Sequence, residues 1–229
     1  MAVDPKEAEA LAKFRDVMGD LYQDDDTLLR FLRAREGDIP KAEEMLRKSL
    51  EWRKENNVSS YVNWKPPTVI AEDFRFNYLG LDKNGYAVMF LPIGRWCIRE
   101  KIEKGHKDDA WLFRFHLLET FIHHVEQSTQ KQFVIILDLS ECSYKKVAHY
   151  ETIQLLLAAF RDFEANYPER LRAAYVIKAP WVFSYVYAFI KPLLSGHTLS
   201  KVKIFDDDET KWRPVLVEGT PDDVLAKMY

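Results

Sequence analysis

The chemically reactive side chains of this 229-residue chain are few and scattered. His123 and His124 are adjacent, and Asp138 ends a run of apolar residues. Neighbouring positions on a helix point about 100° apart, so the two histidines cannot share one face, and they predict no metal site. Asp138 has no nucleophile or base near it in the sequence, so we expect it to make a structural hydrogen bond.

Motifs of catalysis and nucleotide binding do not occur in the sequence. It contains no nucleophile elbow, no P-loop, no dinucleotide fingerprint and no H-E-x-x-H pair. Cys97 and Cys142 lack the spacing of metal ligands and fit a reducing, cytoplasmic environment. We therefore expect a protein that is not an enzyme and holds no metal or cofactor.

Charge is balanced along the chain, with 33 basic and 36 acidic residues. This balance predicts no nucleic-acid partner. The first ten residues are charged and lack an apolar core, so no secretory leader is expected. No run of about 20 apolar residues predicts a transmembrane helix.

The least polar stretch runs from Ala179 to Leu194, where Lys191 is the only charged residue. It predicts a helix over 180–194 between two apolar strands, 174–177 and 202–205. A helix that is apolar on all sides is either buried in a core or faces something apolar that is not protein. The second alternative is a lid over a cavity of lipid size.

The remaining pattern predicts a small helical unit followed by a larger α/β domain. Apolar residues recur at helical spacing over 5–22, 26–36 and 40–57. Asn84-Gly85 between apolar runs is typical of a β-hairpin turn. Helices at 108–126 and 149–166 alternate with a continuous apolar strand at 133–139, which indicates a largely parallel sheet. A short strand and a helix are expected after residue 209.

Four segments resemble the CRAL-TRIO lipid-binding family, which includes the yeast secretory phosphatidylinositol-transfer protein. They are DTLLRFLRARE with EWRK, LDKNG, FVIILDL, and NYPERLRAAYVIKAPWVFSYVYAFIKPLLSGHTLSKV. They cover nearly the whole chain in the family's order, and the last one is specific by itself. The chain looks closest to animal members that bind retinoids, tocopherol or squalene.

The resemblance implies an α/β fold with an N-terminal helical tripod at 1–60 and a lipid-binding domain at 68–229. A mostly parallel five-stranded sheet would form the floor of the pocket, and the helix at 180–194 would close it as a mobile gate. In similar animal proteins a further domain often follows, so we expect the chain to be part of a longer protein.

The family's phosphoinositide-binding residues can be carried over one by one. They fall on Arg35, Asp82, Glu169 with neighbouring Arg170, and Lys201. Cations bind phosphate and carboxylates accept from inositol hydroxyls, so this set is chemically coherent. The alternative is that Arg35 and Glu169 form a structural ion pair.

The family's phosphatidylcholine site is not kept. Its hydroxyl-bearing positions fall on Phe133, Ile135 and Phe163, and its second hairpin tyrosine falls on Met89. A choline phosphate beside these side chains would leave oxygens unpaired, at a cost of several kcal/mol. The apolar side chains at these positions favour a ligand that is more apolar than phosphatidylcholine.

We therefore expect a cytoplasmic monomer that binds a hydrophobic ligand, exchanges it at membranes, possesses no cofactor besides that lipid, and associates with membranes transiently. The ligand would be a retinoid, a tocopherol or a squalene-like lipid, with phosphatidylinositol as an exchange partner. Two alternatives are a phosphatidylinositol-presenting regulator and a scaffold with an empty cavity.

Candidate polar anchors are Tyr78, Ser184, Tyr185 and Tyr187. The candidate binding residues are Tyr78, Phe115, Leu118, Phe121, Ile122, Phe133, Ile135, Leu137, Phe160, Phe163, Tyr175, Ile177, Trp181, Phe183, Val186, Phe189 and Ile190.

Overall fold

The computed structural model describes residues 4–229, which divide into two compact units. The first contains the residues up to Val58 together with the short segment Ala165–Glu169, and the second contains Ser59–Glu164 and Arg170–Tyr229. The prediction of no leader rests partly on residues 1–3, which lie outside the described residues.

Three helices form the first unit, and an aspartate precedes each of them. The carboxylates of Asp4, Asp24 and Asp38 accept hydrogen bonds from backbone N–H groups of the first turns. Such N-caps satisfy donors that would otherwise lack partners. The first helix is shorter than the predicted 5–22 because Gly19, with a φ of 50°, ends it. The elements are α1 (Pro5–Met18), η1 (Gly19–Leu21), α2 (Asp25–Arg33) and α3 (Ile39–Glu55).

Five strands in the order β1-β2-β3-β4-β5 form the sheet of the second unit. The hairpin pair β1 and β2 is antiparallel, and every other neighbouring pair is parallel. Asp82 closes the hairpin by accepting from the backbone N–H groups of Asn84 and Tyr86. The strands are β1 (Asn77–Leu81), β2 (Ala87–Leu91), β3 (Phe133–Asp138), β4 (Leu171–Ile177) and β5 (Val202–Ile204).

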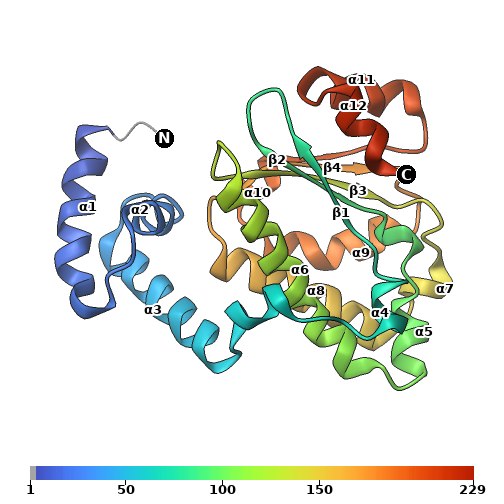
Figure 1. The fold of residues 1–229 in the computed structure, drawn as a ribbon, viewed down its shortest axis with the longest axis horizontal. Coiled ribbons are helices and arrows are strands. Elements are labelled where there is room, and N and C mark those ends of the chain that lie inside the picture. The colour runs from blue at the N-terminus through green and yellow to red at the C-terminus, as the bar shows by residue number, and fades with distance from the viewer. Residues whose placement is uncertain (1–3) are drawn as a thin grey trace. The chain divides into compact units, whose positions relative to one another are not determined.

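Helices cover both faces of this sheet (Figure 1). On one face lie α6 (Lys107–Gln127), α8 (Tyr150–Asn166) and α9 (Phe183–Ile190), and on the other lie α11 (Glu209–Gly219) and α12 (Asp222–Leu225). Within residues 4–229 no helix is both long and apolar enough to cross a membrane. The shorter elements are η2 (Val58–Asn63), α4 (Thr68–Ala71), η3 (Ile93–Arg95), α5 (Ile98–Glu103), α7 (Tyr144–Val147), η4 (Lys191–Leu193), α10 (Gly196–Ser200) and η5 (Ala226–Met228).

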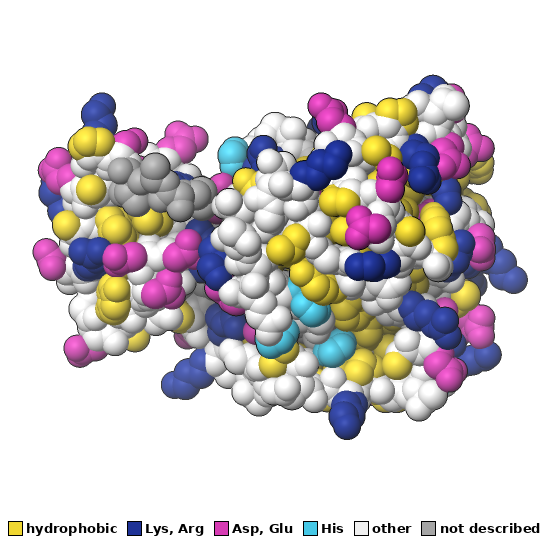
Figure 2. Space-filling model, turned by 45° about the horizontal axis from the view of Figure 1, so that its top comes forward, with side chains coloured by type: hydrophobic (Ala, Val, Ile, Leu, Met, Phe, Trp, Pro, Cys, Tyr) yellow, Lys and Arg dark blue, Asp and Glu magenta, His cyan; other side chains and the backbone are white. Residues whose placement is uncertain are grey.

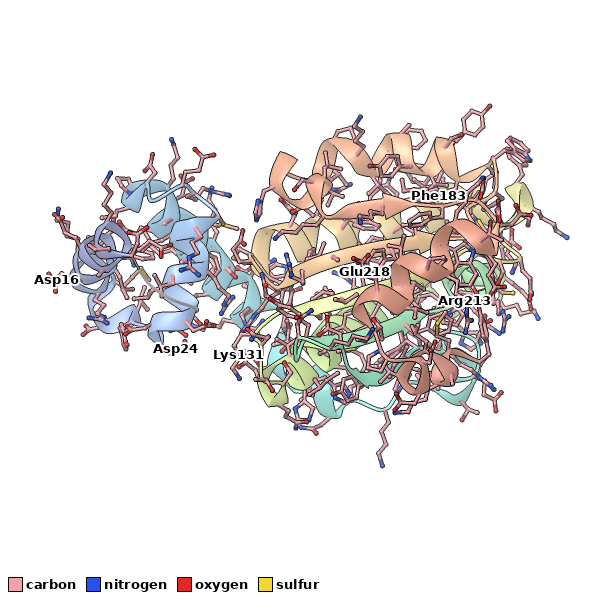
Figure 3. The ribbon with its side chains drawn as sticks, turned by 90° about the horizontal axis from the view of Figure 1, so that it is seen from above. Asp16, Asp24, Lys131, Phe183, Arg213 and Glu218 are labelled. Carbon is pink, nitrogen blue, oxygen red and sulfur yellow. The ribbon has the colours of Figure 1, made fainter. Side chains whose placement is uncertain are left out.

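The C-terminal segment differs from its prediction. The strand expected after residue 209 is wrong, because α11 begins there and buries Trp212 and Leu216 against the sheet. The acidic run before it has a structural role: Asp208 caps α11 and Asp206 pairs with Lys211 at 2.6 Å. Arg213 and Glu218 mark α11 in the view from above (Figure 3).

Candidate ligand-binding cavity

A cavity of about 240 Å³ lies in the second unit between the sheet and helices α6, α8 and α9. Its walls are almost wholly apolar, which suits a ligand that is driven in by loss of contact with water. The predicted residues that line it are Leu118, Phe121, Phe133, Ile135, Leu137, Phe160, Phe163, Phe183, Val186 and Ile190.

Strand geometry explains which residues face this cavity. Side chains alternate along a strand, so Phe133, Ile135 and Leu137 of β3 share the cavity face. On β4 the cavity face carries Ala174 and Val176. The predicted Tyr175 and Ile177 instead pack on the opposite face, in the core beneath α11 and α12, and this corrects their assignment to the pocket.

The register between β3 and β4 is the physical reason for that difference. Phe133 pairs with Leu171, whereas Val134 pairs with Ala173, so β4 carries one extra residue at this point. A bulge of this kind reverses the alternation on one side of it. Leu171 and Ala174 therefore both line the cavity although they are three residues apart.

The helix α9 contributes one wall of the cavity and also an outward apolar surface. Val186 and Ile190 are buried and line the cavity, and Tyr187 lines it too. Tyr185 and Phe189 point away and are 63% and 56% exposed, and Trp181, just before the helix, is 71% exposed. These three residues lie outside the cavity, so their predicted place in the pocket is corrected.

Four other candidates also lie outside the cavity. Tyr78 is partly exposed and stacks on His124, with ring centroids 4.1 Å apart, and burial raises the pKa of its hydroxyl. Phe115 is buried against Tyr61 at 5.3 Å between ring centroids. Ile122 is not among the lining residues, and the Ser184 hydroxyl donates to the backbone carbonyl of Trp181.

Arg114 is a polar residue of the cavity wall that the sequence prediction missed. Its guanidinium donates to the carboxylate of Asp162 at 2.7 Å, and both side chains are 15% exposed. Burial raises the pKa of Asp162, although Arg114 acts in the opposite direction. Its spacing of four residues from Leu118 on α6 is the one signal that could have placed it on this face.

The other polar residues of the wall that were missed are Cys142, Lys146, Thr152 and Thr198. The hydroxyl of Thr198 donates to Glu164 at 2.9 Å. Thr152 is buried in the first turn of α8, and its hydroxyl lies 3.1 Å from Nδ1 of His149. No periodicity marks these positions in the sequence.

The predicted phosphoinositide residues are divided between the two units. Arg35 and Glu169 belong to the first unit, and Asp82, Arg170 and Lys201 belong to the second. Arg170 is buried and has structural partners, because its guanidinium donates to Glu126 and to the carbonyl of Lys131. The phosphoinositide site stays a prediction.

The reactive side chains noted in the sequence, His123, His124 and Asp138, make structural contacts. Within residues 4–229, no group of three or more histidine, cysteine, aspartate or glutamate side chains could hold a metal ion. Histidines gather beside hydrophobic side chains on one face of the second unit (Figure 2). Burial lowers the pKa of His124, and the charge of His123 acts in the same direction. Asp138 is fully buried and accepts from the Tyr229 hydroxyl and the Ser140 backbone N–H, which confirms its expected structural hydrogen bonds.

Comparison with known proteins identifies the class. The family model described as CRAL/TRIO domain matches residues 72–229, and the model described as CRAL/TRIO, N-terminal domain matches residues 5–48. The chain belongs to the CRAL/TRIO family, and the resemblance found in the sequence is confirmed. Membership of this family supports a lipid-binding role for this domain.

Relatives and a solved structure agree with this assignment. The chain is 26% identical over 227 residues to Protein real-time of Drosophila melanogaster, covering 94% of this chain and 34% of that protein. It is 29% identical over 184 residues to a CRAL-TRIO domain-containing protein of Caenorhabditis elegans, covering 77% of this chain and 26% of that one. The chain thus spans about a third or less of these relatives.

The crystal structure of Sfh5 matches the fold with a TM-score of 0.76 at 18% identity, covering 93% of this chain and 84% of that one. The predicted α/β fold, with its N-terminal helices and mostly parallel five-stranded sheet, is confirmed.

Proposed function

We propose that this chain is a non-enzymatic carrier that binds a hydrophobic ligand in the cavity between the sheet and α9 and exchanges it at membrane surfaces. The observation that carries the proposal is the cavity itself, enclosed by side chains of β3, α6, α8 and α9 that are almost all apolar. Each buried CH₂ group contributes about 0.8 kcal/mol, so a ligand with a long hydrocarbon body would be held without many polar contacts.

The walls favour a retinoid, a tocopherol or a squalene-like lipid over a phosphatidylcholine. Phe133, Ile135 and Phe163, which stand where a choline-binding relative would need hydroxyl groups, all line the cavity. They supply no donor to a phosphate oxygen, and a buried unpaired oxygen costs several kcal/mol. No cofactor other than the bound lipid is needed for this function.

The outward side of α9 supports exchange at a membrane. Tyr185 and Phe189, with Trp181 just before the helix, form an exposed aromatic row over the cavity wall. Aromatic side chains of this kind are favourable at a membrane–water interface. Movement of α9 toward the bilayer would open the cavity, and the membrane would stabilise the open state by its differential contact with these rings.

The test is transfer between vesicles of phosphatidylcholine. Donor vesicles carry radiolabelled α-tocopherol or squalene, or the labelled phosphatidylcholine itself, and the label that reaches acceptor vesicles is measured over time. We expect the protein to accelerate movement of a neutral lipid and not of phosphatidylcholine. No acceleration of either neutral lipid above the protein-free rate would contradict the proposal, and transfer of labelled phosphatidylinositol alone would favour the phosphoinositide alternative.

A further inference from the structure

Lys146 is the one ammonium group on the cavity wall within the described residues. It lies on α7, which follows β3 and lies beside α5 (Figure 1). Its Nζ donates to the backbone carbonyl oxygens of Gly94 at 2.9 Å and of Arg95 at 3.1 Å. An ammonium has three N–H donors, so one is left after these two bonds.

No carboxylate among residues 4–229 forms an ion pair with Lys146, as the ion pairs of its surroundings show. Arg114, the other cation of the cavity wall, is neutralised by Asp162. Glu141, the acidic residue close to Lys146 in sequence, pairs with Arg95 at 3.4 Å. Lys146 therefore lines the cavity wall with an ammonium that no carboxylate of the described residues neutralises.

Lys146 lines the cavity next to segments that follow strands β2 and β3. Gly94 and Leu139, at the carboxyl end of the sheet, line the cavity together with Cys142 and Lys146. Burial raises the pKa of the Cys142 thiol, and the nearby charge of Lys146 opposes this shift without cancelling it. Thr152 is a further buried residue of the cavity wall, and its hydroxyl lies 3.1 Å from Nδ1 of His149.

We propose that, among the hydrophobic ligands the cavity can take, a single-chain amphiphile with a terminal carboxylate is bound in preference to its neutral counterparts, and that Lys146 binds this carboxylate while the apolar body lies along β3. The inference rests on the proposed carrier function and specifies its ligand class. A charge-assisted hydrogen bond to a carboxylate is about twice as strong as a neutral one. The cavity volume of about 240 Å³ is just below the usual range of roughly 300–1,000 Å³ for ligand pockets, which favours one chain over the two of a phospholipid.

The test compares ligands that differ only in the end group. Nile red, a neutral dye that fluoresces in apolar pockets, is displaced from the protein by oleic acid, by oleyl alcohol and by octadecene. The variants are Lys146→Met, which keeps an unbranched side chain without charge, and Lys146→Arg, which keeps the charge. Lys145→Met is the matched control, because Lys145 is exposed on the same helix and is not on the cavity wall.

We expect the unaltered protein and Lys145→Met to bind oleate at least about tenfold more tightly than oleyl alcohol, which corresponds to a hydrogen bond with a charged group. Lys146→Met should lose this preference by weakening oleate alone, and Lys146→Arg should keep most of it. Equal binding of acid and alcohol by the unaltered protein would overturn the inference. An equal loss of affinity for oleate and for oleyl alcohol in Lys146→Met would also overturn it. Such a result would show that Lys146 acts only through its hydrogen bonds to the backbone of Gly94 and Arg95.

The carrier proposal fails in a different way. If Nile red, octadecene, the alcohol and the acid all fail to bind, the cavity is not a ligand site, and both proposals fall. If the alcohol and octadecene bind as well as the acid, the carrier function stands and only the assignment of Lys146 is refuted.

Discussion

Filling the cavity from α9 should weaken ligand binding strongly while leaving the fold in place. Val186 is 8% exposed and lines the cavity, so the substitution Val186→Trp directs an indole ring into the space that a ligand would occupy. Tyr185, the preceding residue, is 63% exposed and points away from the cavity. Tyr185→Trp thus adds an indole to the same helix without entering the site.

The size of the effect follows from the volume that is lost. An indole in place of an isopropyl group would displace about four CH₂ groups of a bound chain, each contributing about 0.8 kcal/mol. The expected loss is about 3 kcal/mol, or about 100-fold in Kd. Overpacking strain of about 1–3 kcal/mol applies to the folded protein as well, so its stability must be measured alongside.

The assay is fluorescence titration with Nile red, with thermal unfolding of the same samples. Val186→Trp should raise the Kd about 100-fold, whereas Tyr185→Trp should bind as the unaltered protein does. Unchanged binding by a folded Val186→Trp protein would refute the assignment of the cavity. An equal loss of affinity for Nile red in both variants would show that a change anywhere on α9 weakens binding, whether or not it fills the cavity.

Three further predictions concern stability, and urea unfolding measures each of them. Asp162→Asn removes the counter-ion of the nearly buried Arg114 and should cost about 3 kcal/mol. Gly94→Ala should cost about 3 kcal/mol or more, because a Cβ there would lie 2.3 Å from a backbone carbonyl oxygen that follows β3. Tyr229→Phe removes the hydroxyl that donates to Asp138 and should cost about 2 kcal/mol at pH 7.

Two of these predictions have a matched control. Gly196→Ala should be neutral within about 1 kcal/mol, because nothing lies within 4 Å of a Cβ built there. Removal of the Arg114 guanidinium together with the Asp162 carboxylate should recover part of the loss, since no unpaired charge then remains. A neutral Asp162→Asn or a neutral Gly94→Ala would contradict the packing described for the cavity wall.

The Tyr229→Phe prediction carries a pH dependence. Burial opposes ionisation of Asp138, but hydrogen bonds from Tyr229 and Ser140 hold its pKa below the ordinary value of 3.8. A carboxyl with a lowered pKa adds stability that is present above pH 3.8 and is lost as the pH falls through its folded value. The loss of unfolding free energy in Tyr229→Phe should therefore become smaller as the pH is lowered. A loss that does not change with pH would show that it does not arise from the hydrogen bond to Asp138.

Much of the fold could be predicted from the sequence, because turns, strands and helix starts depend on residues that are near one another in the chain. Asn84-Gly85 sets the hairpin between β1 and β2, and the apolar run from Phe133 makes a strand that is covered by helices on both sides. The aspartates that precede helices mark the start of α1, α2 and α3. The specific segment around α9 carried the family resemblance.

The faces and the polar residues of the cavity could not be predicted in the same way. A bulge in the pairing of β4 with β3 decides which face of the sheet each β4 side chain occupies. Simple alternation along the sequence therefore places Tyr175 and Ile177 on the wrong face. Lys146 lines the cavity and donates to the carbonyl oxygen of Gly94, which lies 52 positions earlier in the chain and also lines the cavity. A contact between segments so far apart leaves no periodic signal in the sequence.

The most direct test of the central claim is native mass spectrometry of the purified protein, followed by extraction of whatever is bound. We expect a single-chain lipid at one molecule per chain, present in the unaltered protein and in Tyr185→Trp and missing from Val186→Trp. A protein that carries no lipid and takes up neither oleic acid nor α-tocopherol from loaded vesicles would contradict it.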